Sequence, residues 1–320
     1  MADLYQPAGG IKKTDIKEEI RRRYGIVRRA SGYHLYTAKG RRLLDMWQER
    51  GSAILGWRSG RAKLVFKNIL DRGITGTFPS ETEGELIGAV RNLLPHYSTV
   101  RWYATKERAR IACAAYLDLW SDIPLIEHPL LHPEASRNFG DSGEDLLSAA
   151  KNLHGVPLWR PWLDDAYYNM SDRVNDSFLR NVNAALKAMV LVSPFPFAGG
   201  CTIAVFAGGE PVNVPPSDSI APALLGAYAR AFRDLAKALF ERSESDWAQF
   251  DSFIAPYWDR RGPYLIPKIA KDRYADFFSS CLDEGILISP NHRIPSVVPF
   301  EADTGNFKPF TLSGLQQFLE

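Results

Sequence analysis

The stretch that decides the fold runs from Met189 to Gly209 and reads MVLVSPFPFAGGCTIAVFAGG. Its two halves, Met189 to Phe197 and Cys201 to Phe206, are apolar runs about as long as fully buried strands. Gly199 and Gly200 separate them and indicate a turn. We therefore expect two buried strands of an α/β protein. The loop that leaves such a strand is where chemistry usually lies.

The bulk composition describes an ordinary globular chain. Its 320 residues suffice for one large domain or two modest ones, and 45% hydrophobic with 24% charged residues is typical of soluble proteins. A formal net charge of +2 gives no electrostatic reason to expect nucleic acid as a partner. The first 45 residues hold eleven Lys or Arg against five Asp or Glu, which we interpret as a solvated helix face and hairpin.

The three cysteines, Cys113, Cys201 and Cys281, are far apart and form no CxxC pair. This usage favours a reduced, cytoplasmic protein and argues against a zinc ribbon or a disulfide scaffold. The polar N-terminus shows no secretory signal, and Gly or Pro interrupts each apolar run before the ~18 residues of a membrane span. We expect a cytosolic protein without a membrane partner.

The residues before the deciding stretch predict several further elements. Capping boxes at Asp15/Glu18 and Ser80/Glu83 each precede an amphipathic helix. The segment 32–46 predicts a hairpin that turns at Lys39-Gly40. Val100 to Ala104 predicts a buried strand that leads into a helix ending near Leu119.

The residues after it predict two long helices and a closing unit. A helix from Phe178 to Met189 would lead into the stretch, and Ser217 or Ser219 would cap a helix whose apolar face runs from Leu224 to Leu239. The closing unit has a helix at 274–281, Gly285 as its C-cap, a strand at 286–288 and a final helix at 312–318. From Trp120 to Leu158 we expect mostly loop, with one helix at 146–153.

Two short motifs are interpreted as structural. His128 and His132 have the spacing of metal ligands on a helix, but Pro129 and Pro133 disfavour a helix there, so we predict no metal site. The segment Gly140 to Gly143 is similar to a serine-protease nucleophile segment, yet without disulfides or a nucleophile elbow it is a polar turn. The sequence has no P-loop and no GxGxxG.

A resemblance covers both ends of the chain. It rests on GYHLYTAKGRRLLD (32–45), ILGW (54–57), Arg72-Gly73, Ser80-x-x-Glu83-x-x-Leu86 and VRW (100–102), and near the C-terminus on YADFF (274–278) and GILISP (285–290). In this order the segments resemble the class III PLP-dependent aminotransferases, a family that includes glutamate-1-semialdehyde aminomutase.

The resemblance implies an α/β fold of the PLP-dependent transferase type I, with a reduced large domain on a mainly parallel sheet. A small α/β domain would combine both termini: 1–75 and 251–320 would form it, and 76–250 the large domain. It also implies a homodimer with sites shared between subunits, pyridoxal 5'-phosphate as cofactor and a small amino compound as substrate.

The departures from the family fall on the cofactor motifs. Where the family has Asn-Ser-Gly-Thr-Glu-Ala to hold the phosphate at a helix N-terminus, this chain has Ala104 to Ala109. Thr105 offers a hydroxyl and Lys106 a charge, but lysine replaces the glycine that lets the backbone approach phosphate. The family's aromatic-His-Gly motif has no counterpart after Leu119.

Two further cofactor contacts have only partial candidates. A carboxylate at a strand end must hold the pyridine nitrogen, and Asp164 or Asp165 is the candidate, although a surface turn or helix N-cap explains them equally well. The aldimine lysine should lie just before the glycine turn, but Pro196 or a neighbour occupies that place and the nearest lysine is Lys187. Helical spacing would place Lys187 on a solvated helix face.

Ser217 precedes Ala221-Pro222 where this family brings a partner subunit's hydroxyl to the phosphate, and a helix cap explains the same residue. Our first hypothesis is a family member degenerate at the lysine and phosphate motifs, possibly a non-catalytic binding protein. The alternative is an active aminotransferase or aminomutase that uses Lys187. A third is an unrelated small-molecule enzyme that uses His34 or His292.

Overall fold

The computed structural model describes residues 15–58, 60–127, 155–163, 187–300, 302–311 and 313–319. Three sheets organise these residues, with strand orders β4-β8-β7-β6-β5, β1-β2-β3-β11 and β12-β10-β9. The helix expected at 146–153, the motifs at His128/His132 and Gly140 to Gly143, and the helix expected from Phe178 to Met189 up to residue 186 lie outside the described residues. The end of that second helix is wrong, because Ala188 and Met189 belong to a strand. The α/β fold class expected from the sequence is confirmed.

The five-stranded sheet is the centre of the larger lobe. Its strands are β4 (Thr99–Tyr103), β5 (Leu125–Glu127), β6 (Val156–Trp159), β7 (Ala188–Leu191) and β8 (Thr202–Phe206). Strands β5, β6 and β7 run parallel, β8 runs antiparallel to both β7 and β4, and β4 therefore has the direction of β7. The carboxyl ends of four strands thus meet at one edge, here called the carboxyl edge, and β8 begins there.

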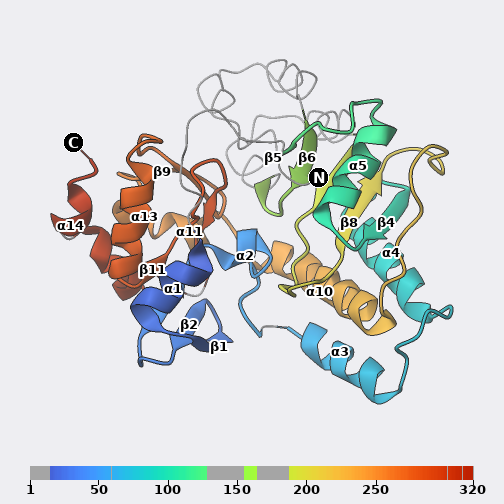
Figure 1. The fold of residues 1–320 in the computed structure, drawn as a ribbon, viewed down its shortest axis with the longest axis horizontal. Helices are drawn as coiled ribbons and strands as arrows, with labels where there is room; N and C mark the ends of the chain where they lie inside the picture. Colours follow the sequence, from blue (N-terminus) through green and yellow to red (C-terminus); the bar gives the residue numbers. More distant parts are fainter. Residues whose placement is uncertain are drawn as a thin grey trace.

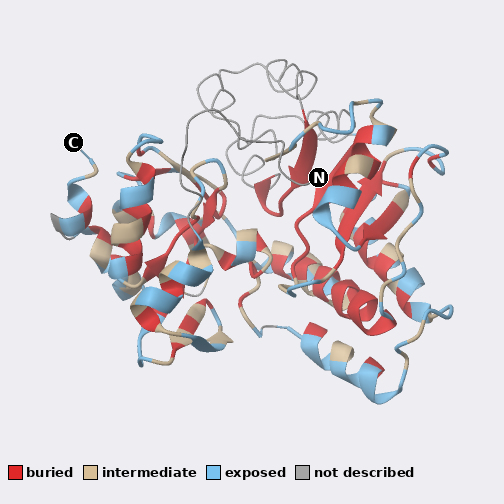
Figure 2. Cartoon of the chain, in the orientation of Figure 1, coloured by how far each residue is buried: buried red, intermediate tan, exposed pale blue. Residues whose placement is uncertain are grey.

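Alternation of side chains along these strands builds two cores. Val190, Ala204 and Phe206 lie on the face that α5 (Lys106–Tyr116) covers. Leu191 and Ile203 point to the other face, together with the buried sides of α4 (Glu81–Leu93) and α10 (Pro222–Glu241). Figure 2 shows the sheet and much of α10 in the colour of buried residues. A strand buried on both faces is apolar at every position, which is the pattern of the deciding stretch.

The deciding stretch forms the two neighbouring strands that the sequence predicts, but the first is shorter. Strand β7 ends at Leu191, whereas the apolar run extends to Phe197. Pro194 and Pro196 explain the difference, since proline cannot donate a ladder hydrogen bond. The residues 192–201 instead form a loop at the carboxyl edge. Gly200 is required in it because a Cβ there would lie 2.2 Å from the Tyr228 hydroxyl oxygen.

The two ends of the chain share the smaller lobe (Figure 1). Strands β1 (Val27–Ser31), β2 (His34–Thr37) and β3 (Arg42–Asp45) form the expected hairpin region, and β11 (Ile286–Leu287) joins β3 in parallel. The lobe also contains these elements: α1 (Ile16–Tyr24), α11 (Ser245–Ala248), α12 (Asp251–Ile254), β9 (Trp258–Arg261), β10 (Tyr264–Pro267), α13 (Tyr274–Asp283), β12 (Ser296–Val297), the 3-10 helix η2 (Thr304–Thr311) and α14 (Ser313–Gln316).

Two helix starts differ from the expectation. Ser80 is the N-cap of α4, but its hydroxyl bonds Thr82 Oγ1 at 2.7 Å, so no capping box forms. Helix α10 begins at Pro222 with Ala221 as N-cap, because Ser217 and its neighbour run along β4 instead. Between the lobes, α2 (Gln48–Gly51) leads to α3 (Ala62–Asp71), which packs on α10.

Candidate functional site at the carboxyl edge of the sheet

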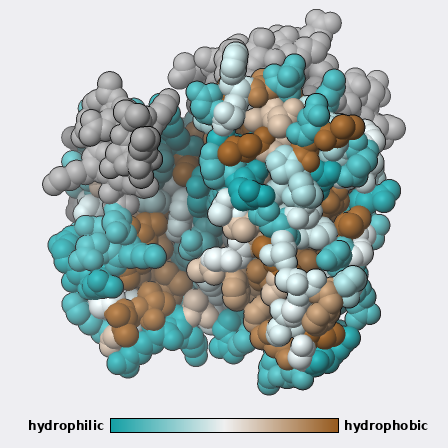
Figure 3. All heavy atoms as spheres, turned by 45° about the vertical axis from the view of Figure 1, so that its right-hand side comes forward, coloured by the Kyte–Doolittle hydropathy of each residue, from teal (hydrophilic) through white to brown (hydrophobic). Residues whose placement is uncertain are grey.

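Charged residues from four separate segments gather at the carboxyl edge. Lys106 opens α5 just after β4, Glu127 ends β5 and Arg160 follows β6. Glu49 and Arg50 come from α2, between the lobes, and interact electrostatically with Lys106. Figure 3 shows a hollow between the two lobes of the molecule. The open carboxyl ends of parallel strands are where α/β proteins usually bind ligands.

Arg160 is the buried centre of this cluster, with 1% of its surface exposed. Its Nε donates to Glu127 Oε2 at 2.6 Å and its Nη1 donates to the carbonyl oxygen of Arg50 at 2.8 Å. The guanidinium carbon lies 5.2 Å from the centre of the Tyr264 ring. Its Nη2 is buried and has no hydrogen-bond partner among the described residues. A buried guanidinium with a free donor is an unusual and costly feature.

Arg50 is held in a strained backbone. Gln48, Glu49 and Arg50 have φ angles of 50°, 48° and 62°, so three consecutive residues with side chains adopt the left-handed conformation. Each such residue costs on the order of 1 kcal/mol, and strain of this kind clusters at functional sites. Gly51 follows at φ 91°, and a Cβ there would lie 2.8 Å from Arg160 Nη1. The turn therefore lies directly against Arg160.

Asp45 anchors the start of this turn. Its buried carboxylate accepts hydrogen bonds from the Trp47 amide at 3.0 Å, the Gln48 amide at 2.7 Å and the Trp57 indole at 2.7 Å. Burial is the largest influence on this group and raises the pKa of Asp45 to about 6, although the three hydrogen bonds oppose the shift. The carboxylate thus fixes the segment that leads to Arg50.

Lys106, which the sequence analysis named as a candidate at the phosphate end, belongs to the cluster. Its side chain keeps exposed surface, yet the protein surrounds its ammonium group closely. Burial first, and then the positive charges of Arg50 and Arg160, lower the pKa of Lys106 to about 8. Glu49 and Glu127 oppose this shift. Lys106 therefore exchanges its proton near neutral pH, which is a property of functional lysines.

Thr105 and Ser217 are engaged in structural hydrogen bonds. Thr105 is the N-cap of α5, and its hydroxyl accepts from the Arg108 amide at 3.2 Å. The Ser217 hydroxyl accepts from the Trp102 amide at 3.3 Å within the same chain. The next residue, Asp218, accepts from the Ala104 amide at 2.8 Å and forms a bidentate pair with Arg108. The arginine hydrogen bonds hold the pKa of Asp218 below its usual range.

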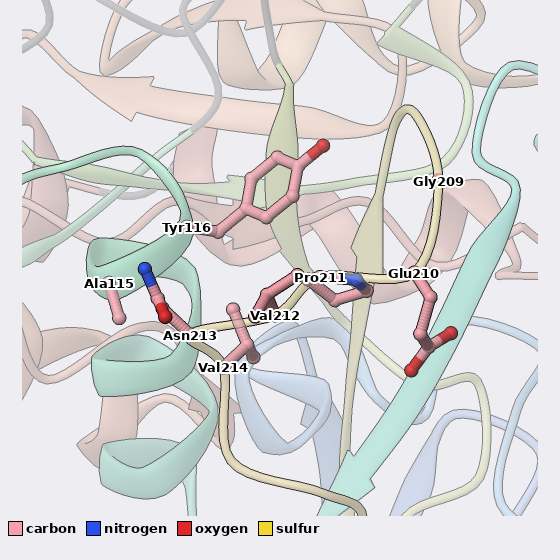
Figure 4. A pocket seen from close by; sticks show the side chains of 8 residues that line it. All are labelled: Ala115, Tyr116, Gly209, Glu210, Pro211, Val212, Asn213 and Val214. Atoms are coloured by element: carbon pink, nitrogen blue, oxygen red, sulfur yellow. The ribbon is translucent and has the colours of Figure 1, made fainter.

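The opposite edge of the sheet has a second hollow of about 350 Å³, shown in Figure 4. Ala115, Tyr116 and the loop 209–214 line it. The Tyr116 hydroxyl donates to the carbonyl of Ala207, and the Glu210 carboxylate pairs with Arg101. Lys187 lies at this edge, exposed and directly before β7, and its carbonyl accepts from the Ala207 amide at 2.8 Å. It is solvated as expected but is not in a helix.

Comparison with known proteins places the fold in a known class. No family model matches the chain. An uncharacterized protein of Treponema pallidum is 29% identical over 88% of this chain and 91% of its own, and one of Borreliella burgdorferi is 24% identical over 92% and 93%. An omega-transaminase from Sphaerobacter thermophilus superposes with a TM-score of 0.59 at 14% identity over 92% of this chain and 91% of that one. Acetylornithine aminotransferase from Elizabethkingia anophelis superposes with a TM-score of 0.54 at 14% sequence identity, over 92% of this chain and 93% of that one. The chain has the PLP-dependent transferase fold of type I.

The described residues do not fit PLP in the way that the resemblance requires. A lysine should lie between β7 and the glycine turn, but Pro196 and its neighbours lie there, and the sequence has no lysine from 188 to 236. Lys187 precedes β7, whose four residues span about 13 Å, so it is not brought together with Thr105 and Lys106. Asp164 and Asp165 lie outside the described residues. The residue that leaves β6 is Arg160, a cation.

The N-terminus of α5, where the family would hold the phosphate, also differs from the family's pattern. The carboxylate of Asp218 lies at the N-terminus of α5, where it accepts from the backbone before the helix. A glycine that would allow close backbone approach is absent from Ala104 to Ala109. The described residues thus differ from the family at the phosphate end as well as at the lysine position.

Other kinds of site find little support. Within the described ranges no group of three or more His, Cys, Asp or Glu side chains could hold a metal ion, and no helix there is long and apolar enough to cross a membrane. All three cysteines are buried, and burial raises the pKa of each thiol, which is the opposite of an activated nucleophile. His292 bonds the carbonyl of Ile269 at 3.0 Å and lies edge-on to Tyr274.

Proposed function

We propose that this protein binds a small molecule at the carboxyl edge of its five-stranded sheet and carries no aldimine chemistry. One observation supports this most: the loop that follows β7 up to the glycine turn holds no lysine, and the residue that follows β6 is the cation Arg160. Strained and buried polar groups are costly, and they persist where they serve a ligand. Arg50, Lys106 and Arg160 provide such groups at the place where this fold class binds its ligands.

The alternative is an active PLP enzyme that uses Lys187. It has the support of the fold, since omega-transaminase and ornithine aminotransferase are among the structures that superpose on this chain. It requires Lys187 to reach the carboxyl edge from the far end of β7. The geometry favours the first proposal.

Absorption spectroscopy with added PLP tests the proposal. The purified protein would be titrated with PLP, reduced with borohydride and mapped by peptide mass spectrometry, alongside the variants Lys187→Arg and Lys106→Arg. We expect no stoichiometric adduct on any single lysine, only scattered labelling of surface lysines. A stoichiometric adduct on Lys187 would establish the alternative, and one on Lys106 would equally overturn the proposal.

We further propose that the protein is a homodimer. Apolar side chains gather around α3 and the loop 192–201: Leu64, Phe78 and Phe197 are 56%, 52% and 43% exposed, and the Phe66 and Phe197 rings lie 5.4 Å apart. Exposed apolar groups that cluster often mark an interface. Sedimentation equilibrium should give twice the chain mass, and Phe197→Asp should shift it toward the monomer. A monomeric wild-type protein would refute this.

A further inference from the structure

The cluster at the carboxyl edge has a definite charge. Arg50, Lys106 and Arg160 are positive, and Glu49 and Glu127 are negative, which leaves one uncompensated positive charge. Glu127 is already the partner of Arg160, and Glu49 is exposed to solvent. The excess charge is thus carried by Arg50 and Lys106. Such a site favours a single negative charge over a neutral or doubly charged ligand.

The cluster also has unused hydrogen-bond donors. Arg50 Nε is buried without a partner among the described residues. An unsatisfied buried donor is costly and favours a ligand that accepts a hydrogen bond. The first-turn amides of Lys106 and Glu107 have no bonded partner in the same part of the chain, since Thr105 caps only Arg108. All of these groups can only donate, so the ligand must accept.

Arg160 acts as a positioning residue rather than as a contact. The Arg160 Nη1 donates to the Arg50 carbonyl and so connects the left-handed turn to the sheet. Glu127 fixes the orientation of the Arg160 guanidinium. The cation of Arg50 is thereby held near Lys106 although the two come from segments more than fifty residues apart. Preorganisation of this kind lowers the entropic cost of binding.

We propose that Arg50 and Lys106 form the anion-contacting part of a binding site for a small organic monocarboxylate, with Arg160 as the residue that positions Arg50. This inference rests on the proposed function and names its ligand class. A carboxylate has one charge and two acceptor oxygens, one for each cation. A dianion such as phosphate would leave one negative charge uncompensated beside Glu127.

The proposal has a consequence for pH. Because the pKa of Lys106 is lowered to about 8, part of its charge is lost at pH 8 and most at pH 9. Glu49, Arg50, Glu127 and Arg160 are the charged groups that face it. Carboxylate binding should therefore weaken about tenfold from pH 7 to pH 9. Lys106→Arg keeps the charge and should remove this dependence.

Calorimetric titration tests the proposal with matched probes. Formate, acetate, pyruvate and benzoate would each be compared with the corresponding neutral amide at constant ionic strength, with inorganic phosphate as the dianion. At least one acid should bind while its amide does not. Lys106→Met and Arg50→Met should each weaken that acid at least tenfold, and Lys187→Met, at the opposite edge, should leave it unchanged. Lys106 is exposed, so its variant is expected to fold even if that of Arg50 does not.

The proposal is overturned if no acid binds better than its amide, if phosphate binds more tightly than every acid, or if Lys106→Met binds as well as the wild type. These results differ from a failure of the proposed function. A reduced PLP adduct on one lysine would refute the absence of aldimine chemistry and would leave the carboxylate titrations unaffected. If no carboxylate binds and no reduced PLP adduct forms, only the proposed ligand class is refuted.

Discussion

The two edges of the five-stranded sheet each carry an arginine paired with a glutamate, but the pairs are built differently. At the carboxyl edge the side chains of Arg160 and Glu127 are 0% and 18% exposed. At the opposite edge those of Arg101 and Glu210 are 10% and 75% exposed, and Arg101 also donates to the carbonyls of Val214 and Pro215. Both arginines are thus buried, but the glutamate is largely buried only at the carboxyl edge and is open to solvent at the other. Only the first arrangement is expensive to maintain.

The largest effect is expected from Glu127→Gln. The substitution leaves the buried guanidinium of Arg160 without its counter-charge, and breaking a buried pair in this way costs about 3–5 kcal/mol. Urea unfolding followed by circular dichroism would measure the loss. Because Glu127 keeps some exposure, the lower end of the range is expected. A change below about 1 kcal/mol would show that Arg160 does not depend on this partner and would weaken the contrast between the edges.

The second prediction concerns the pH dependence that Asp45 adds. Its folded pKa of about 6 lies above the unfolded value of 3.8, so between these values the native state binds more protons than the unfolded state. The free energy of unfolding should therefore fall by about 2 kcal/mol as the pH rises from 4 to 6. The contribution is fully present below the unfolded pKa of 3.8 and is lost as the pH rises through the folded pKa of about 6.

Asp45→Asn provides the control, since asparagine cannot titrate but retains an acceptor for the Trp47 and Gln48 amides. The difference in unfolding free energy between the wild type and Asp45→Asn should change by about 2 kcal/mol between pH 4 and pH 7. Equal pH profiles for the two proteins would contradict the raised pKa. They would also contradict the interpretation that burying the Asp45 carboxylate, which fixes the strained turn, is electrostatically unfavourable.

The fold was largely predictable from the sequence because the buried faces of helices and strands produce regular patterns of apolar residues. The apolar runs at 189–206, the stripe of α4 and the face of α10 each indicate their element directly. The errors fall where hydrogen bonding, not hydrophobicity, decides: the early end of β7 at Leu191 and the start of α10 at Pro222. The family resemblance at both termini anticipated the fold that the superpositions show.

The site was less predictable. Lys106 stood out because it replaces a glycine in a known motif, but Arg50 and Arg160 carry no local signal. Arg50 depends on a left-handed turn of residues that rarely adopt it. Arg160 depends on the register that brings the ends of β5 and β6 together. The roles of Lys187, Asp164 and Asp165 remain predictions.

A third, smaller effect separates the lysines of the two edges. At pH 7.5 a lysine with a pKa of about 8 is roughly a quarter unprotonated, against about one part in a thousand for an ordinary lysine. The less basic amine of Lys106 is also a weaker nucleophile, which offsets part of this gain. Lys106 should therefore react with acetic anhydride on the order of tenfold faster than Lys187. Timed acetylation with peptide mass spectrometry measures both in one sample. Equal rates would show that the ammonium of Lys106 is better hydrated than its surroundings indicate.

The smallest effect is expected from Glu210→Gln, the counterpart of Glu127→Gln at the opposite edge. Glu210 is 75% exposed, so water already screens its charge, and pairs of this kind contribute between 0 and about 1 kcal/mol. Arg101 keeps two carbonyl acceptors after the substitution and is not left as an unpaired buried charge. Urea unfolding in low and high salt would measure the change. A loss as large as that of Glu127→Gln would mean that the Arg101–Glu210 pair maintains the conformation of the loop 209–214. It would also mean that the buried arginine depends on its glutamate at both edges of the sheet.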